Sequence, residues 1–273
     1  MSDMFPSQQL LFYLAQPLIR RNRKFENRHA GQSCYVLGNG ASLKGMDLAR
    51  FSDRISIGCN SLFVHQDFNQ LDCRYYFLPA AFLFHRYRKY YGSWQRNYMG
   101  DLYRKKVLAH SAVSFFTSLS NWVGLRADNL YYTHHFGSRA WDFGRASVDG
   151  HFSFMQGGIY AMIGLAFFMG FESITLVGCD YAFSPRYGSH FFEKGLGQKI
   201  EDEEEIYGGD FFSDCSKVLN LSIVVPDHIE SKLMPRLEYS AYAKKPFRYR
   251  ENTEIVARQD LEVLSKQGFY NIF

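Results

Sequence analysis

Short apolar segments recur along the chain, and stretches with helical spacing separate most of them. Each apolar segment is rich in Val, Ile, Leu, Phe or Tyr and is bounded by polar or turn-forming residues, which is typical of a buried strand. The segments are 35–37, 55–59, 72–79, 112–119, 129–135, 173–181 and 222–226. Strands that alternate with helices predict an α/β fold with a mainly parallel sheet and helices on both faces.

The segments between the strands differ in character. Residues 159–171 (IYAMIGLAFFMGF) form the longest apolar run and predict a buried helix, too short for the roughly 20 residues that span a membrane. Residues 82–106, 214–221 and 251–267 also have the appearance of helices. Residues 184–213 are polar, acidic and rich in glycine, and therefore predict a lid that follows the strand ending at Asp180.

Residues 1–30 stand apart from the rest, because an apolar run (LLFYLAQPLI) is followed directly by a basic one (RRNRKFENRH). We therefore expect an N-terminal amphipathic, basic segment over 1–30 and a single domain with its lid over 31–273. The N-terminal segment has two interpretations: a helix packed on the domain with a solvated basic tip, or a peripheral contact with an anionic membrane. Met1–Gln9 lacks the basic start of a signal peptide, so the expected location is the cytoplasm.

Composition narrows the function classes. The chain has 273 residues, of which 47% are hydrophobic, enough for a sizeable core, and 18% are aromatic. A net charge of only +4 gives no reason to expect a nucleic-acid partner. The five cysteines are scattered and form no CxxC pair, so we expect reduced thiols and neither disulfides nor a zinc site.

The segment CYVLGNGASL (34–43) has the strongest functional signal. A strand ends in Gly38, Asn39 and Gly40, and two glycines around an asparagine predict a tight turn whose backbone amides can approach a ligand. Ser42 is expected to cap a helix that begins near Leu43. Such turns at the carboxyl ends of parallel strands are where nucleotides tend to bind.

Other strand ends carry suitable polar residues. Asn60 follows the second strand, and Asp180 and Tyr181 follow the strand that ends in Gly-Cys. The buried helix begins at Gln156, Gly157 and Gly158, which predicts outward-pointing amides at its positive end. In a parallel sheet these strand ends converge on one edge, so we expect them to form a nucleotide site.

Three motifs in order, GNGASL, GCNSLF and QGGIYAMIGLAFFMGFESITLVGCDYAF, resemble bacterial sialyltransferases of glycosyltransferase family 42. They also resemble the related motility accessory factors and the archaeal hydroxymethylpterin pyrophosphokinases. The resemblance covers about residues 33–190. It implies a Rossmann-like sheet, a CMP-activated nonulosonic acid as donor, a histidine as general base and no metal. The sequence departs from the family at Phe77-Leu78-Pro79, where an asparagine is expected beside the proline, and at Gln156-Gly157-Gly158.

The resemblance also implies roles for residues. Asn39 and Asn60 would touch the nucleotide, Gly157 and Gly158 would lie close to sugar or phosphate, and Asp180 would close the site. A tyrosine, Tyr181 or Tyr187, would lie near the departing phosphate. The predicted site therefore comprises catalytic His190 and Tyr187, with substrate-binding Gly38, Asn39, Gly40, Ser42, Asn60, Gln156, Gly157, Gly158, Asp180 and Tyr181.

His190 follows Asp180 by ten residues, and Glu193 could orient it as a base for an acceptor hydroxyl. His151, just before the glycine-led helix, is the alternative base. The acidic run at 201–205 reads more readily as a solvated patch than as a Mg²⁺ site.

The predicted function is inverting transfer of a sugar from a CMP-linked donor to a bacterial surface glycan or glycolipid, such as lipopolysaccharide or capsule. The alternatives are an ATP- and Mg²⁺-dependent diphosphokinase and a non-catalytic nucleotide-binding module, and a homo-oligomer is left open.

Overall fold

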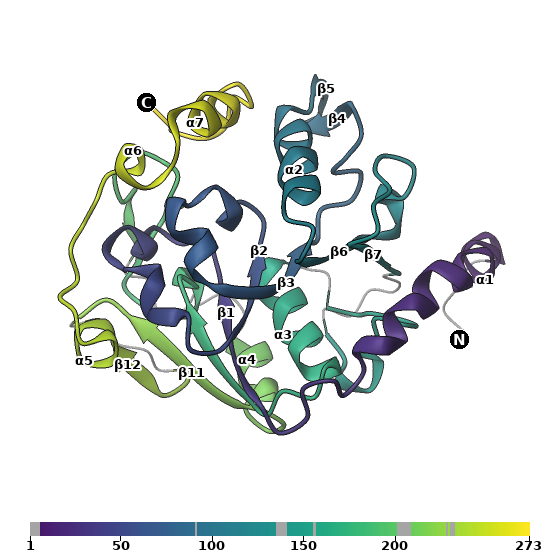
Figure 1. The fold of residues 1–273 in the computed structure, drawn as a ribbon, viewed down its shortest axis with the longest axis horizontal. Coiled ribbons are helices and arrows are strands. Elements are labelled where there is room, and N and C mark those ends of the chain that lie inside the picture. The colour runs from purple at the N-terminus through teal and green to yellow at the C-terminus, as the bar shows by residue number, and fades with distance from the viewer. Residues whose placement is uncertain are drawn as a thin grey trace. The chain divides into compact units, whose positions relative to one another are not determined.

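In the computed structural model, drawn as a ribbon in Figure 1, the chain forms two compact units. Unit 1 comprises Met1–Gln32 and Tyr75–Phe171, and unit 2 comprises Ser33–Arg74 and Glu172–Phe273. The structure describes residues 6–90, 92–134, 141–154, 157–200, 209–227, 229 and 233–273. Each unit has its own parallel strands, so the predicted α/β class and parallel pairing are confirmed in both.

Five parallel strands form the sheet of unit 2. In spatial order they are β12 (Arg236–Glu238), β11 (Asn220–Val225), β8 (Ser173–Val177), β1 (Ser33–Leu37) and β2 (Ile55–Cys59). Every residue of β2 is buried, as are the last four of β1 and of β8, because these strands are apolar on both faces. The short strand β12 (RLE) lacks an apolar run, so sequence pattern did not predict it.

β1 pairs with β2 on one side and with β8 on the other. The chain therefore leaves β1 in one direction along the sheet and later returns to its opposite side. Such a reversal of strand order places a crevice outside the carboxyl ends of the two strands, which is where ligands bind in open α/β sheets. In this chain those two carboxyl ends are the Gly38-Asn39-Gly40 turn and the Gly178-Cys179-Asp180 turn.

Short helices complete unit 2, and two predictions about them need correction. The helix expected at 214–221 is α4 (Gly209–Cys215), and β11 already begins at Asn220. The helix expected at 251–267 is broken into α6 (Asn252–Ile255) and α7 (Arg258–Ser265), because extended Val256 bridges to His65. The other helices and short strands are η2 (Ala41–Gly45), η3 (Leu48–Phe51), η4 (Leu62–Val64), η5 (Gln66–Gln70), η8 (Asp180–Ala182), α5 (Tyr239–Ala243), β9 (Arg186–Tyr187) and β10 (Lys199–Ile200).

In unit 1, β3 (Asp72–Leu78, which enters the unit at Tyr75) pairs in parallel with β6 (Ser114–Ser118), and β6 pairs with β7 (Leu130–Thr133). The predicted buried helix is α3 (Gly158–Phe168), with eight of its eleven residues buried. Gly164 lies against the ring of Phe154, where an added Cβ would come within 2.4 Å of a ring carbon. The 3-10 turns η6 (Leu119–Asn121) and η7 (Phe143–Arg145) also belong to this unit.

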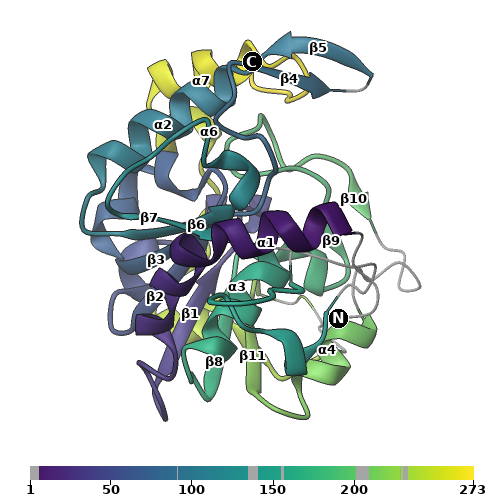
Figure 2. The same cartoon turned by 90° about the vertical axis from the view of Figure 1, so that its right-hand side faces the viewer.

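Residues 82–106 are not one helix, as the sequence analysis expected. Strands β4 (Tyr87–Tyr90) and β5 (Ser93–Arg96) form an antiparallel hairpin, which Figure 2 shows extending beyond helix α2 (Tyr98–Ala109). Gly92, at φ +91°, supplies the backbone conformation that the hairpin turn requires. Neither β4 (YRKY) nor β5 (SWQR) has an apolar run or a regular alternation of apolar and polar residues, so local pattern did not predict these strands.

The N-terminal segment forms α1 (Pro6–Ile19), followed by the 3-10 helix η1 (Arg20–Phe25). Phe25 is buried between the rings of Tyr75, Phe116 and Tyr131, which attaches the segment to the strands of unit 1. Among the described residues, no helix has the length and apolar character needed to cross a membrane. Cys34, Cys59 and Cys179 are buried, as predicted.

Candidate functional site

The turn after β1 is fixed to the turn after β8 by backbone hydrogen bonds. The Gly38 amide donates to the Val177 carbonyl at 2.8 Å, and the Gly40 amide donates to the Gly178 carbonyl at 2.8 Å. A Cβ on Gly38 would lie 2.4 Å from the Gly178 oxygen, so only glycine allows this approach. The two strand ends that flank the crossover therefore form one rigid element.

The Asp180 carboxylate stabilises this element through hydrogen bonds from Ser42. It accepts the Ser42 backbone amide at 2.9 Å and the Ser42 hydroxyl at 2.5 Å, and both side chains are buried. Burial raises the pKa of Asp180 to about 6, while the hydrogen bonds from Ser42 act in the opposite direction. The sequence predicted that Ser42 caps a helix, and this prediction is wrong. The turn continues as the 3-10 helix η2, which begins after Gly40 without a side-chain cap.

The turn does not offer the row of free amides that the sequence suggested. Besides Gly38 and Gly40, Ala41 donates its amide to the Ser189 carbonyl and Ser42 donates to Asp180. These donors are satisfied within the protein, because the turn is packed against both β8 and the segment that follows it. A ligand at this turn would instead meet side chains and carbonyl groups.

Asn39 connects the turn to the next strand and retains an acceptor. Its Nδ2 donates to the Cys59 carbonyl at 2.9 Å, which joins the ends of β1 and β2. Its Oδ1 is buried and accepts no hydrogen bond from the residues that the structure describes. Asn60, one residue past β2, has φ +49°, a left-handed conformation that asparagine tolerates better than most residues. Asn60 thus has a clear role in the turn, whereas Asn39 has an acceptor that a ligand could satisfy.

His190 is brought to the same turn. Ser189–Phe191 run antiparallel to Asn39–Ala41: His190 bridges to Gly40, and the Phe191 amide donates to the Asn39 carbonyl at 3.0 Å. Phe191 is fully buried and Phe192 nearly so, and their burial fixes this segment in place. The polar composition of the segment had suggested a lid instead. The predicted grouping of the GNG turn, Asp180 and His190 is therefore present in unit 2.

His190 and Glu193 form a hydrogen-bonded pair. The Nδ1 atom of His190 lies 2.6 Å from Glu193 Oε1, and the same oxygen accepts the His190 backbone amide at 2.9 Å. Burial acts to raise the pKa of Glu193, but the hydrogen bonds from His190 outweigh it and hold that pKa below its usual range. An ionised Glu193 favours the tautomer with hydrogen on Nδ1, which leaves a lone pair on Nε2. The ring is about one-third exposed, so Nε2 can serve as a base.

Glu193 is itself held by residues that the sequence analysis did not identify. The buried Lys44 ammonium donates to the carbonyls of Glu193, at 2.5 Å, and Gly195, and pairs with Glu251 at 3.8 Å. The amide of Asn271 donates to Glu193 Oε2 at 3.2 Å, and the ring of Tyr270 packs edge-on against His190. No local pattern reveals these residues, because they come from segments far apart along the chain.

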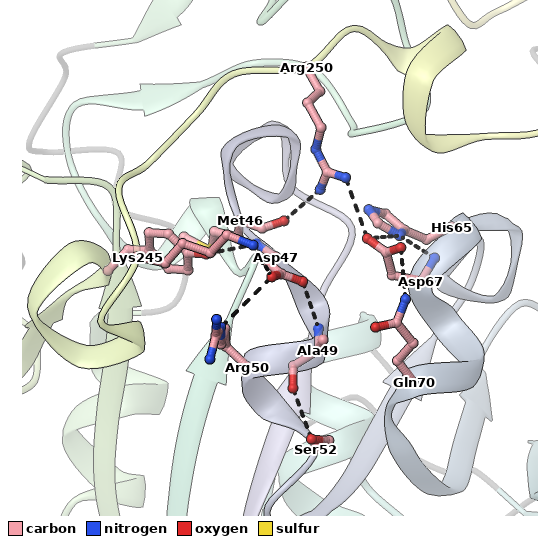
Figure 3. A network of polar contacts seen from close by, with 11 residues as sticks. Met46, Asp47, Ala49, Arg50, Ser52, His65, Asp67, Gln70, Lys245 and Arg250 are labelled. Atoms are coloured by element: carbon pink, nitrogen blue, oxygen red, sulfur yellow. Dashed lines mark hydrogen bonds and ion pairs between the residues drawn. The ribbon is translucent and has the colours of Figure 1, made fainter.

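A second polar network joins the segment that follows η2 to η5 and to Lys245 and Arg250 (Figure 3). Arg250 donates to the Met46 carbonyl at 2.8 Å and pairs with Asp67 at 3.4 Å, and Lys245 pairs with Asp47 at 2.5 Å. His65 accepts the Asp67 amide on Nδ1 at 3.1 Å, as Figure 3 shows. The backbone amides of Arg248 and Arg250 also donate to the carbonyls of Gly45 and Lys44, so the backbone at the end of η2 is fixed as well.

Other predicted residues are not brought to this turn by any described contact. Tyr181 is 44% exposed with Arg186 over its ring, and Tyr187 pairs with Lys199 in the β9–β10 hairpin. Gly157 and Gly158, at the start of α3, belong to unit 1, as does His151, which bridges to His134.

Gln156, the acidic run and the centre of the proposed lid lie outside the described residues. Within the described part of the chain, no three His, Cys, Asp or Glu side chains group as metal ligands.

No family model matches the chain, and no curated protein matches it. Among solved structures, it is similar to the sialyltransferase CstII from Campylobacter jejuni in complex with CMP-3FNeuAc, at 15% identity and TM-score 0.42, over 86% of this chain and 98% of that one. The complex of CstII with cytidine-5'-monophosphate gives 18% and 0.44, over 87% and 97%.

The chain is also similar to the MAf glycosyltransferase from Magnetospirillum magneticum AMB-1, at 13% identity and TM-score 0.42, over 95% of this chain and 42% of that one. A sialyltransferase and a MAf glycosyltransferase are kinds of protein that the sequence motifs resemble. Similarity of this extent assigns no role to any residue of this chain.

Proposed function

We propose that the protein is a glycosyltransferase that moves a CMP-activated nonulosonic acid onto a hydroxyl group of a bacterial surface glycan. The observation that carries the proposal is the His190–Glu193 pair, which backbone bonds fix beside the Gly38-Asn39-Gly40 turn. A base oriented by a carboxylate, at a strand crossover suited to nucleotides, fits transfer from a nucleotide-sugar to an alcohol. The choice of donor rests on the resemblance of the sequence motifs.

The proposed reaction is a direct displacement with inversion. His190 Nε2 takes the proton from the acceptor hydroxyl, and the oxygen attacks the anomeric carbon of the donor sugar. The bond from that carbon to the phosphate oxygen breaks, and CMP leaves with the electron pair. Glu193 stabilises the imidazolium that forms. Asn39 Oδ1 would accept a hydrogen bond from the nucleotide, and the Tyr187 hydroxyl would donate to the departing phosphate.

The diphosphokinase alternative would use Asp180 to bind Mg²⁺. In the structure both carboxylate oxygens of Asp180 accept hydrogen bonds from Ser42, and the side chain is 2% exposed. This arrangement favours a supporting role for Asp180 beneath the turn, and it gives the alternative no specific support.

The first experiment measures thermal stability with CMP, CDP, UDP, GDP and ATP, each with and without Mg²⁺. A ligand that binds only the folded state raises the melting temperature, so CMP should give the largest increase, and Mg²⁺ should not change it. An increase with ATP that requires Mg²⁺ would support the diphosphokinase instead. If none of the five nucleotides raises the melting temperature, the proposal of a nucleotide site is wrong.

The second experiment measures turnover of the CMP-linked donor. His190→Ala should lower turnover by roughly 10²–10⁴-fold and leave CMP binding nearly unchanged. His151→Ala is the comparison, since it tests the alternative base in unit 1. Inactivity of His151→Ala with full activity of His190→Ala would move the base. CMP binding without donor turnover in the unaltered protein would indicate a non-catalytic binding module.

A further inference from the structure

Helix α1 has two apolar faces, and only one of them is packed against residues that the structure describes. Ala15 and Ile19 are buried, and the ring of Phe12, on the same face, lies 5.0 Å from that of His134. The opposite face carries exposed apolar side chains at i, i+3, i+4 and i+7. These are Leu10 (61% exposed), Tyr13 (59%), Leu14 (71%) and Pro17. In a soluble helix this spacing normally marks the face toward a core, so the exposed stripe requires a partner.

The partner must also tolerate positive charge, because the stripe continues directly into the basic helix η1. Exposed cations outnumber the nearby acids of the described residues, Glu26 and Asp149. The cations are Arg20, Arg21, Arg23, Lys24 and Arg28. Arg23 is 70% exposed even though it pairs with Asp149, and Lys24 donates to the Tyr131 hydroxyl. The helix therefore presents an apolar surface and a cluster of cations side by side.

We propose that α1 and η1 dock on an anionic lipid surface. Acyl chains would cover the stripe of Leu10, Tyr13 and Leu14, while lipid phosphates would neutralise the cations of η1. Tyr13 is suited to the boundary between the two, because its ring is apolar and its hydroxyl is polar. An anionic lipid surface supplies both kinds of contact along one short helix, and a reversible interfacial contact needs no spanning segment.

The experiment is co-sedimentation with phosphatidylcholine vesicles, with and without phosphatidylglycerol as about one third of the lipid. The full chain should bind the anionic vesicles, bind neutral ones much less, and dissociate as salt is raised. Leu10→Ser with Leu14→Ser should weaken binding roughly tenfold. Arg20→Gln with Arg21→Gln should weaken it roughly 25-fold, at about fivefold for each cation near the surface.

Matched controls alter equally exposed residues elsewhere. Val123→Ser with Val218→Ser removes exposed apolar groups, and Lys105→Gln with Arg258→Gln removes two charges, so both controls should bind as the unaltered chain does. Circular dichroism confirms that each variant remains folded, and the arginine variant decides the matter if the leucine variant does not fold.

Absence of vesicle binding, or equal binding by the α1 and control variants, would overturn the proposal. A lipid-free dimer in sedimentation velocity that Leu10→Ser with Leu14→Ser dissociates would also overturn it, because the stripe would then be a contact between copies. None of these measurements depends on the proposed transferase activity.

Discussion

The Lys44 ammonium lies 2.5 Å from the carbonyl oxygen of Glu193, although 149 positions separate the two residues along the chain. Lys44 is fully buried, and burial lowers its pKa while the charges of Glu251 and Glu193 oppose that effect. The contact joins the 3-10 helix after the GNG turn to the segment that orients His190. Lys44 therefore acts as a positioning residue for the proposed base.

Lys44→Met should destabilise the protein by about 3 kcal/mol, because it leaves two carbonyl groups without this donor and Glu251 without this cation. Urea denaturation measures the change. Lys245→Met is the matched control, since its pair with Asp47 is half-exposed and should contribute less than about 1 kcal/mol. Equal losses in the two variants would show that burial of Lys44 is not what matters.

Glu193→Gln should lower kcat roughly tenfold or more and leave the KM for the donor nearly unchanged. The amide can donate as well as accept, so it no longer fixes hydrogen on His190 Nδ1. Glu262→Gln is the control, because that exposed glutamate pairs with the exposed Arg258. The His190 Nδ1–H resonance in NMR provides a readout that needs no activity, and its persistence in Glu193→Gln would contradict the assignment.

Asp180 should make stability depend on pH. Its pKa is raised from 3.8 to about 6 by burial, so its ionisation in the folded state costs free energy. The neutral carboxyl group of Asp180 therefore contributes stability that is fully present below the unfolded-state pKa of 3.8. That contribution is lost as pH rises through the folded-state pKa of about 6. The free energy of unfolding of the unaltered chain, relative to Asp180→Asn, should therefore fall by about 3 kcal/mol between pH 4 and pH 7. A difference that does not change over that range would contradict the raised pKa.

Gly40→Ala should destabilise the protein by roughly 2 kcal/mol or more and weaken CMP binding, because the new Cβ would lie 2.1 Å from Asp180 Oδ1. Gly157→Ala is the comparison. There the nearest atom is a Tyr160 ring carbon at 3.6 Å, so the cost should stay below about 1 kcal/mol. Thermal unfolding and calorimetry with CMP measure both quantities, and a well-tolerated Gly40→Ala would show that the turn is not tightly packed.

His65 should act in the opposite pH direction from Asp180. Burial, with the nearby Arg250, lowers the pKa of His65 to about 3, so its contribution is present above the unfolded pKa near 6.5 and is lost as pH falls. His65→Asn keeps an acceptor for the Asp67 amide and removes the titration. The unaltered chain should lose about 3 kcal/mol relative to this variant between pH 6.5 and pH 4. Parallel pH curves for the two proteins would rule out the lowered pKa.

Local pattern predicted what local forces determine. The main strands are continuous apolar runs because both of their faces are buried. The Gly38-Asn39-Gly40 turn could be predicted because its two glycines allow a close backbone approach. The His190–Glu193 pair could be predicted from the sequence because the two residues are only three positions apart. Two adjacent phenylalanines, Phe191 and Phe192, are a local sign of burial. The polar residues around them led instead to the prediction of a lid.

The remaining features depend on distant parts of the chain. Ser42 forms no cap because Asp180, 138 positions away, takes both its amide and its hydroxyl. Lys44 resembles an ordinary surface lysine until the turn at 193–195 covers it. Nothing near Asn271 indicates that its amide meets Glu193. These contacts arise only when the segments pack together.

The partners of Glu193 also set a time at which the site can exist during synthesis. Asn252 donates to the carbonyls of Phe192 and Ile272, and the Asn271 amide reaches the carboxylate that orients His190. A ribosome makes the GNG turn and His190 long before it makes residue 271. A nascent chain that already has every residue of the motif would therefore lack the amide that holds the Glu193 carboxylate, and the proposed base could be oriented only after residues 252–272 have been synthesised and have folded back onto residues 192–193.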